Sequence, residues 1–417
     1  MNPIFLSWGI GLAATAGVIL RPFKWPEAIW AVTGALVLVA LGLLPASLAW
    51  QAVGKGTDVY LFLIGMMLLS ELGRREGLFD WVAVLAVNFA KGSPRKLFLL
   101  VYLVGVVVTT FLSNDAAAVV LTPAVFAAAK KADTKPLPLL FVCAFIANAA
   151  SFVLPISNPA NLVLYANHTP ALGLWVARFA VPSVLSIVAT FLMLLWTQRD
   201  ELNGRCAADL PVEKLSANGK LTLAAIGVTA VVLLTVSALD MQLGLPTACL
   251  GILTAVIVLI KERQSPMHLM REISWSVLPL VAGLFVLVEM LDHTGVIKSL
   301  SNLLISVTHD NATMSAAISG LVIAFGSNAI NNLPAGLIAS ATALQAHSPE
   351  RVIDALLIGV DLGPNLSITG SLATILWLTS IRREGEEVTF LQFFKVGTLV
   401  MVPALILSLG ARLLIGP

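Results

Sequence analysis

The sequence has little charge for its length. Only 12% of its 417 residues are Asp, Glu, Lys or Arg, whereas soluble domains carry about 25%, and 58% are hydrophobic, with a mean hydropathy of +0.93. This composition excludes an ordinary soluble enzyme. The formal net charge of +2 also excludes the strongly basic face of a nucleic-acid-binding protein. We therefore expect the lipid bilayer as a partner and no nucleic acid.

Cysteines are scarce as well. Cys143, Cys206 and Cys249 lie too far apart for a disulfide framework or a CxxC metal pair, so we expect no metal and no cofactor. A phosphate-binding GxxxxGK[ST] loop is also missing, because the nearest string, Gly54 to Thr57, lacks the preceding glycine at the required spacing. The chain is not expected to hydrolyse ATP or to be an enzyme.

Long apolar runs fill the rest of the sequence. A run of roughly 20 apolar residues predicts a membrane-spanning helix, and ten are expected: 3–20, 28–44, 58–73, 137–165, 171–196, 221–239, 245–260, 275–291, 352–381 and 390–415. Two more apolar stretches, 97–129 and 313–345, are each interrupted by polar residues and predict re-entrant hairpins. The predicted fold class is an all-α polytopic membrane protein.

The positive charges predict an orientation. Lys and Arg gather in cytoplasmic loops, and most of the 25 lie in six of the predicted loops: 21–27, 74–96, 130–135, 198–220, 261–272 and 382–387. The loops before and after 97–129 are both among these, so that stretch must enter and leave from the cytoplasm. We expect a multi-pass protein of the cell (inner) membrane with both termini on the non-cytoplasmic side.

The two halves of the chain are related by an internal repeat. At one constant offset, Leu63-Ile64-Gly65, Glu71 and Gly77 align with Val281-Ala282-Gly283, Glu289 and Gly295. Five crossings per half require an inverted second copy, which is typical of secondary transporters. The predicted organisation is an N-terminal repeat, 1–197 (hairpin 97–129, broken helix 137–165), a cytoplasmic linker, 198–220, and an inverted C-terminal repeat, 221–417 (hairpin 313–345, broken helix 352–381).

Four polar interruptions at membrane depth are candidates for a shared site. Non-helical backbone is tolerated there only where it is buried in protein or lines a cavity, so we expect the four segments to converge. None contains Lys or Arg, which favours a small polyhydroxylated or weakly charged solute. The candidate substrate-binding residues are Ser113, Asn114, Asn148, Ser157, Asn158, Asn161, Asn328, Asn331, Asn332, Asn365, Thr369 and Ser371.

Acidic residues inside the predicted membrane region are few. An ionised carboxylate at the bilayer centre costs roughly 2.5 to 3.5 kcal/mol and is functional by default, which points to Asp115 and, in the second half, Asp361. A structural alternative is that Asp115 caps the helix starting at Ala116. Glu71 and Glu289 lie near span ends beside Arg74 and His293, so a local ion pair or an interfacial position is the simpler interpretation.

Four strings together carry a family resemblance. They are FLSNDAAAVVLTP (111–123), LPISNPANL (154–162), NNLPAGL (331–337) and GPNLSITGSLATILWL (363–378). Their order and spacing resemble the arsenical-pump membrane proteins, the ArsB-type arsenite efflux transporters of the ion-transporter superfamily, over essentially the whole chain. The resemblance implies export of arsenite or antimonite driven by proton entry, with or without a soluble arsenite-stimulated ATPase. It also implies elevator-like alternating access, in which a transport domain with both hairpins moves against a scaffold.

The candidate residues fit that substrate. Arsenite is an uncharged trihydroxy species in neutral water, so Asn, Ser and backbone dipoles can replace its hydrogen bonds to water without a countercharge. Proton coupling needs a titratable group, for which Asp115 is the first candidate and Asp361 the second. A sodium-coupled carboxylate transporter or a sodium/proton antiporter stays an alternative, because Asn and Ser oxygens also suit sodium. A channel or a purely structural membrane subunit is a third interpretation.

Overall fold

The computed structural model describes residues 2–165, 169–263 and 265–415. Within these ranges the chain forms helices and contains no strand. The elements of the first half are α1 (Pro3–Leu20), η1 (Pro22–Lys24), α2 (Glu27–Ala40), α3 (Ala46–Lys55), α4 (Thr57–Arg75), α5 (Leu78–Ala90), α6 (Pro94–Leu112), α7 (Asn114–Ala116), the π-helical turn η2 (Ala117–Leu121), α8 (Thr122–Lys131), α9 (Pro136–Ala149), η3 (Pro155–Ser157), α10 (Pro159–Tyr165) and α11 (Leu172–Gln198).

The second half repeats much of this order. Its elements are α12 (Ala217–Ala238), α13 (Gly244–Glu262), α14 (Pro266–Glu272), α15 (Val277–His293), α16 (Val296–Asp310), α17 (Ala312–Ile330), α18 (Asn332–Gln345), α19 (Glu350–Leu362), η4 (Gly363–Leu366), η5 (Ile368–Gly370), α20 (Leu372–Arg383) and α21 (Phe390–Leu414).

Among the described residues, seven helices are long and apolar enough to cross a membrane, or nine if α3 with α4 and α14 with α15 each form one bent span. The predicted all-α membrane fold is therefore confirmed. The segment 74–96 is not a loop as expected, because α5 lies within it, and α16 occupies another expected loop. Both helices are shorter than a membrane span, at 13 and 15 residues, so a search for runs of about 20 apolar residues misses them.

The offset of the sequence repeat recurs in the helix bounds. Both α6 and α17 are 19 residues long, and they start at equivalent positions of the two repeats. The residues before them, Ser93 and Asn311, cap these helices by accepting hydrogen bonds from Lys96 N and Met314 N at 3.4 and 3.0 Å. Packing follows the same relation, because α4 packs on α13 as its counterpart α15 packs on α2.

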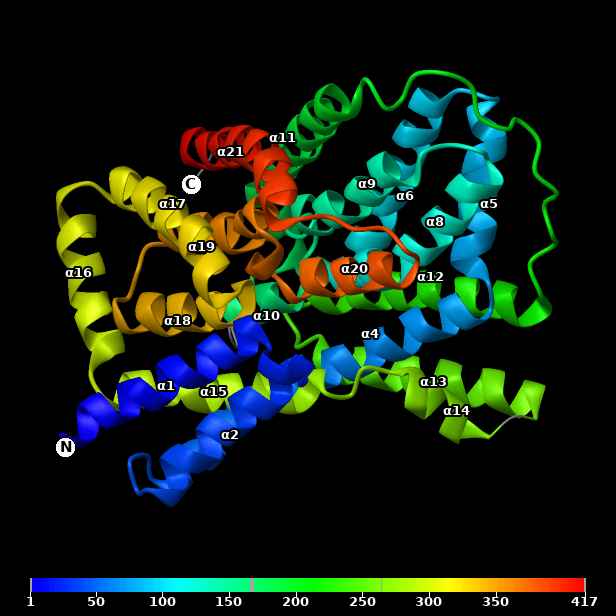
Figure 1. Cartoon of the computed structure of the whole chain (residues 1–417). Coiled ribbons are helices and arrows are strands. Elements are labelled where there is room, and N and C mark those ends of the chain that lie inside the picture. Colours follow the sequence, from blue (N-terminus) through cyan, green and yellow to red (C-terminus); the bar gives the residue numbers. More distant parts are fainter. Residues whose placement is uncertain (1, 166–168, 264, 416–417) are drawn as a thin grey trace.

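The helices form two layers (Figure 1). We call α1, α2, α4, α13, α14 and α15, at the bottom of the view, the lower layer. The hairpins and broken helices, from α6 to α10 and from α17 to α20, lie above it with α11 and α21. α10 packs against α4, and α18 packs against α15, so the hairpins and broken helices contact the lower layer.

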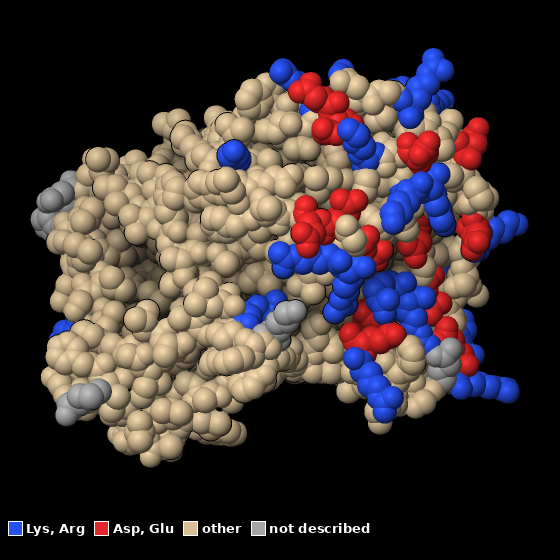
Figure 2. Space-filling model, viewed as in Figure 1, with Lys and Arg blue, Asp and Glu red and all other residues tan. Residues whose placement is uncertain are grey.

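Charged side chains gather at one end of the molecule. Figure 2 shows most of the visible Lys, Arg, Asp and Glu residues on the right, where Figure 1 shows the chain between α11 and α12 and helix α14. Ion pairs there join Arg75 to Glu262 at 3.0 Å and Arg74 to Glu272 at 3.0 Å. We call this the charged end. A one-sided concentration of Lys and Arg is the pattern of a cytoplasmic face.

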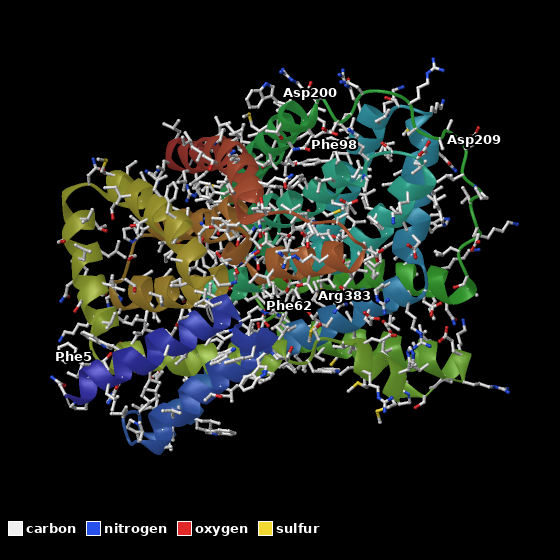
Figure 3. The ribbon with its side chains drawn as sticks, viewed as in Figure 1. Phe5, Phe62, Phe98, Asp200, Asp209 and Arg383 are labelled. Atoms are coloured by element: carbon white, nitrogen blue, oxygen red, sulfur yellow. The ribbon has the colours of Figure 1, made fainter. Side chains whose placement is uncertain are left out.

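Large apolar side chains cover the outside as well as the core. Phe5 on α1 is 64% exposed, whereas Phe62 on α4 and Phe98 on α6 are fully buried; Figure 3 shows all three, with Asp200 and Asp209 on the polar linker at the charged end. Exposed apolar surface of this extent suits contact with acyl chains and not with water.

Candidate functional site

The tips of the two hairpins have the same backbone shape. Ser113, between α6 and α7, has φ 111° and ψ 161°, and Asn331, between α17 and α18, has φ 75° and ψ 152°. Positive φ with extended ψ is a region that essentially only glycine occupies freely. Both tips therefore hold a strained residue, and the repeat offset aligns the two positions.

The first broken helix is stabilised at its break by side-chain hydrogen bonds. Between α9 and α10, the Asn161 Nδ2 donates to the Ser151 and Leu154 carbonyls at 2.8 and 3.2 Å. The Ser157 hydroxyl donates to the Thr110 carbonyl at 3.0 Å. These bonds satisfy carbonyls freed by the break, and they attach it to the first hairpin.

The second broken helix is attached to the second hairpin in a similar way. The Ser367 hydroxyl donates to Asn328 Oδ1 at 2.8 Å, and the Thr369 hydroxyl donates to the Asn328 carbonyl at 3.1 Å. Asn331 Nδ2 donates to the Thr369 carbonyl at 3.4 Å. Ser371 caps α20 by accepting from Thr374 N at 3.1 Å.

The two broken helices also contact each other. Asn148 Nδ2 donates to Asn365 Oδ1 at 3.0 Å, and Asn158 Nδ2 donates to Asp361 Oδ1 at 2.8 Å. All four side chains are buried, and the other oxygen of Asp361 has no hydrogen-bond partner within the described ranges. The four polar segments thus form one connected network.

A small cavity lies where the hairpin tips meet the lower layer. Its polar lining consists of Asn114, Asp115, Asn158 and Asn332. Leu63 of α4 and the α15 residues Val277 and Val281 close the lower side. Asp115 is the only charged residue of this lining, which contains no Lys or Arg. We call this space the tip cavity.

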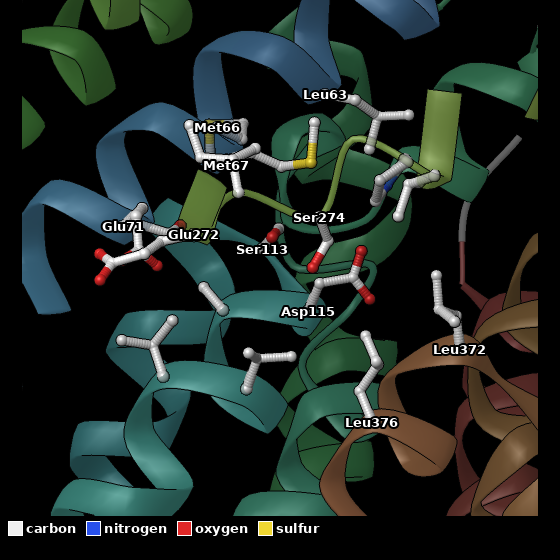
Figure 4. A pocket seen from close by; sticks show the side chains of 17 residues that line it. Leu63, Met66, Met67, Glu71, Ser113, Asp115, Glu272, Ser274, Leu372 and Leu376 are labelled. Carbon is white, nitrogen blue, oxygen red and sulfur yellow. The ribbon is translucent and has the colours of Figure 1, made fainter. Parts of the chain in front are cut away.

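The tip cavity continues toward the charged end. Asp115 also lines a neighbouring cavity with Ser113, Glu71 and Glu272 (Figure 4). Glu71 and Glu272 line a third space that extends to Thr379, Ser380, Arg383 and Glu384. The three spaces share lining residues, so they form one route from the tips to the charged end.

The opposite side of the tip cavity is closed. A separate cavity there is lined by Lys55, Asp58, Glu289 and Asp292 and by apolar side chains such as Leu162 and Leu337. It shares no lining residue with the tip cavity, and Lys55 Nζ binds Glu289 at 2.6 Å across it. Among the described residues, the cavities that share lining residues with the tip cavity therefore lead toward the charged end.

The predicted site residues divide into two groups. Ser113, Asn114, Asp115, Asn158 and Asn332 line the cavities. The others belong to the surrounding hydrogen-bond network: Asn148, Ser157, Asn161, Asn328, Asn331, Asp361, Asn365, Thr369 and Ser371.

Three sequence interpretations of the acidic residues can be compared with the geometry. The Asp115 carboxylate accepts no hydrogen bond in the described part of the chain, so it does not cap the helix. Glu71 pairs with Arg74 as expected, but the expected pairing of Glu289 with His293 is wrong, because Glu289 pairs with Lys55. Lys55 belongs to the other half of the sequence, beyond the reach of a local argument.

Several polar lining residues of the route were not predicted from the sequence, and two of them lie together. Glu272 and Ser274 lie at the bend between α14 and α15, and both line the route to the charged end. Their only sequence signal is the repeat offset, which aligns Ser274 with Gly56 in the bend between α3 and α4.

Comparison with known proteins shows that this chain is similar to membrane transporters. A citrate transporter family model (CitMHS) matches residues 15–359. The arsenical pump membrane protein of Escherichia coli K12 is 29% identical over 97% of this chain and 93% of its own length; that of Yersinia enterocolitica is 27% identical over 87% and 86%. An uncharacterized transporter of Mycobacterium tuberculosis is 22% identical over 96% of each chain.

A solved structure shares the fold. The crystal structure of the YdaH transporter of Alcanivorax borkumensis, described as having an unusual topology, matches with a TM-score of 0.61 and 14% identity over 99% of this chain and 98% of that chain. Taken with the family match and the membrane helices, this makes the chain a transmembrane transporter.

Proposed function

We propose that this chain, which belongs to the CitMHS citrate transporter family, is a secondary transporter that exports arsenite, and antimonite, in exchange for protons. The observation that supports arsenite as the substrate is the lining of the tip cavity, which has three amide side chains and one carboxylate and no Lys or Arg. The relatives that are named arsenical pump membrane protein and match most of this chain also support this substrate.

The lining suits a neutral hydroxylated solute. An amide has two N–H donors and an acceptor oxygen. Asn158 already uses one N–H on Asp361 and its oxygen on Ala160 N, and Asn114 uses its oxygen on Asp115 N. The remaining N–H donors of Asn114 and Asn158 and the amide of Asn332 can replace hydrogen bonds that the three hydroxyls of arsenite make with water. A citrate or dicarboxylate anion would bring several negative charges beside Asp115, and leaving them without a cationic partner is costly away from water.

The proposed coupling group is Asp115. It is the charged member of the tip cavity and has a route to the charged end, so a proton can reach it from water. Asp361 is the second candidate, but it is buried against Asn158 and lines none of the cavities described above. We assign it to holding the broken helices together, with proton binding as its secondary role.

The proposed motion is an elevator movement of the upper layer against the lower layer. The tip cavity lies between Asn114 and Asn332 above and α4 and α15 below, so sliding one layer along the other would carry the solute from one mouth to the other. The positive-inside rule makes the charged end cytoplasmic. The structure then corresponds to the state that loads solute from the cytoplasm.

A sodium-coupled carboxylate transporter or sodium/proton antiporter is the alternative. The unpartnered Asp361 oxygen and the unpartnered, buried Asn148 and Asn161 amide oxygens are ligands of the kind that sodium accepts. The two functions differ in the driving gradient and in the solute.

The test is transport by the chain on its own. An arsenite-sensitive bacterium that expresses this chain without any ATPase subunit should gain arsenite and antimonite resistance, with no change in salt tolerance. Everted vesicles should take up arsenite when an inward-acid pH gradient is imposed and lose the uptake with a protonophore. Salt tolerance without metalloid resistance, or uptake of citrate driven by sodium, would favour the alternative.

A further inference from the structure

Ser274 in the lower layer places a hydroxyl on the route to the charged end, whereas Gly56 at the repeat-equivalent position has none. We propose that Ser274 is a substrate-binding residue that acts when the site faces the charged end, so that the transporter binds its solute more tightly from that side than from the other. This inference rests on the proposed function and concerns which side binds more strongly.

Ser274 is free to bind a ligand. It lies between α14 and α15, whose axes meet at a 46° bend, and it lines two of the three spaces of the route, those beyond the tip cavity. Figure 4 shows the Ser274 and Asp115 side chains in the same cavity, Ser274 on the lower layer and Asp115 on the hairpin. The Ser274 residue is exposed, and its hydroxyl makes no hydrogen bond to any part of the chain that the structure describes. A serine hydroxyl both donates and accepts, which matches the hydroxyls of a neutral trihydroxy solute.

The equivalent place on the opposite side cannot supply this group. Gly56 is the repeat equivalent of Ser274 and lies in the 48° bend between α3 and α4. A Cβ atom at Gly56 would lie 2.4 Å from the Tyr60 hydroxyl oxygen and 2.8 Å from the Phe285 ring. These two rings, with centroids 6.2 Å apart, fill the space that a hydroxyl would need. The Tyr60 hydroxyl itself donates to the Val53 carbonyl at 3.0 Å.

The two mouths therefore differ in what the lower layer offers. At the charged end the solute meets the Ser274 hydroxyl beside the Glu71, Arg74 and Glu272 cluster. At the other mouth it meets a glycine covered by aromatic rings and the closed Lys55 and Glu289 pair. An extra hydrogen bond in one state strengthens binding in that state alone, so the concentration of solute that half-saturates transport should be lower at the charged end.

The experiment compares Ser274→Ala and Ser276→Ala on both faces of the membrane. In everted vesicles, whose outer surface is cytoplasmic under the proposed orientation, Ser274→Ala should raise the KM for arsenite roughly three- to tenfold, the effect of one lost hydrogen bond. In right-side-out vesicles the arsenite counterflow KM should not change. Ser276→Ala is the matched control, because Ser276 is also exposed, is close to Ser274 in the chain and lines none of these cavities.

Ser274→Thr keeps the hydroxyl and should restore the wild-type KM, which a purely structural role for Ser274 would not predict, and it serves as the second variant if Ser274→Ala folds poorly. An unchanged KM for Ser274→Ala in everted vesicles, or an equal rise on both faces, would overturn the assignment while leaving arsenite transport intact. Absence of arsenite uptake by the wild type would instead refute the proposed function, and the role of Ser274 with it.

Discussion

The two hairpins share a backbone and differ in chemistry. Ser113 and Asn331 adopt the same unusual conformation, but just after these tips the first hairpin has Asp115, which lines the tip cavity, and the second has Leu333 in the same cavity. The two hairpins thus share the geometry that opens a polar pocket between two helix ends, whereas only the first has a charged residue at this position. A single carboxylate in an otherwise neutral cavity can change the charge of the site by one unit when it binds a proton.

The largest expected effect comes from removing that difference. Asp115→Asn keeps the size and hydrogen-bonding capacity of the side chain but cannot change its charge, so proton-driven arsenite uptake into everted vesicles should fall to the level of empty vesicles. Leu333→Asn places an amide at the equivalent position of the other hairpin and should keep measurable proton-driven uptake. Wild-type uptake by Asp115→Asn, at equal amounts of protein in the membrane, would remove Asp115 from the mechanism.

Much of this comparison could be read from the sequence, because the relevant signals are local. Bilayer thickness fixes the length of a spanning helix, and polar residues such as Ser113 and Asn331 stand out within apolar runs, so most helix bounds and the candidate residues were accessible. The helices α5 and α16 were not, since their apolar runs are too short for a span. The Lys55 and Glu289 pair and the place of Ser274 were also inaccessible, because both depend on how distant helices pack.

The second-largest expected effect tests whether Asp361, the buried carboxylate of the second half, has a structural role. Asn158→Ala removes the hydrogen-bond donor to the buried Asp361. Asp361 Oδ2 already lacks a partner among the described residues, so the variant leaves both oxygens unsatisfied, and an unsatisfied buried polar group costs about 1 to 3 kcal/mol. The melting temperature of the detergent-purified protein should therefore fall.

Combining Asn158→Ala with Asp361→Asn replaces the unsatisfied buried carboxyl by an amide that cannot ionise, so the double variant should melt above the Asn158→Ala single variant. A double-mutant cycle gives the interaction energy. If the two changes are additive, Asn158 and Asp361 do not act as a pair, and the proposed division of roles between Asp115 and Asp361 loses its support.

A smaller effect is expected from the strained tips. The backbone strain is alike in both halves, but replacing Asn331 also removes its side-chain hydrogen bonds to the Thr369 carbonyl and from Leu333 N. Residues in this part of φ,ψ space cost roughly 1 to 3 kcal/mol, and glycine relieves the cost. Ser113→Gly and Asn331→Gly should each raise the melting temperature or leave it unchanged, whereas Ser113→Val and Asn331→Val should lower it.

The comparison between halves is the critical measurement here. If valine is tolerated at one tip and not at the other, the two hairpins do not share a backbone in the membrane. Ser274 and Gly56 could then no longer be treated as equivalent positions of the two repeats.

The smallest expected effect is a difference in stability between variants of the ion pairs at the two mouths. Lys55 is 59% exposed in its side chain and, among the described residues, binds Glu289 alone, and an exposed pair contributes about 0 to 1 kcal/mol. Arg74 binds both Glu71 and Glu272, so Arg74→Ala leaves two carboxylates facing each other without a cation. Lys55→Ala should therefore shift the melting temperature less than Arg74→Ala, and added salt should reduce the difference between them because it screens the repulsion of the two carboxylates. Equal, salt-independent shifts would mean that the Arg74 cluster is no more than two ordinary surface pairs, and that the charged mouth differs from the other only in its Ser274 hydroxyl.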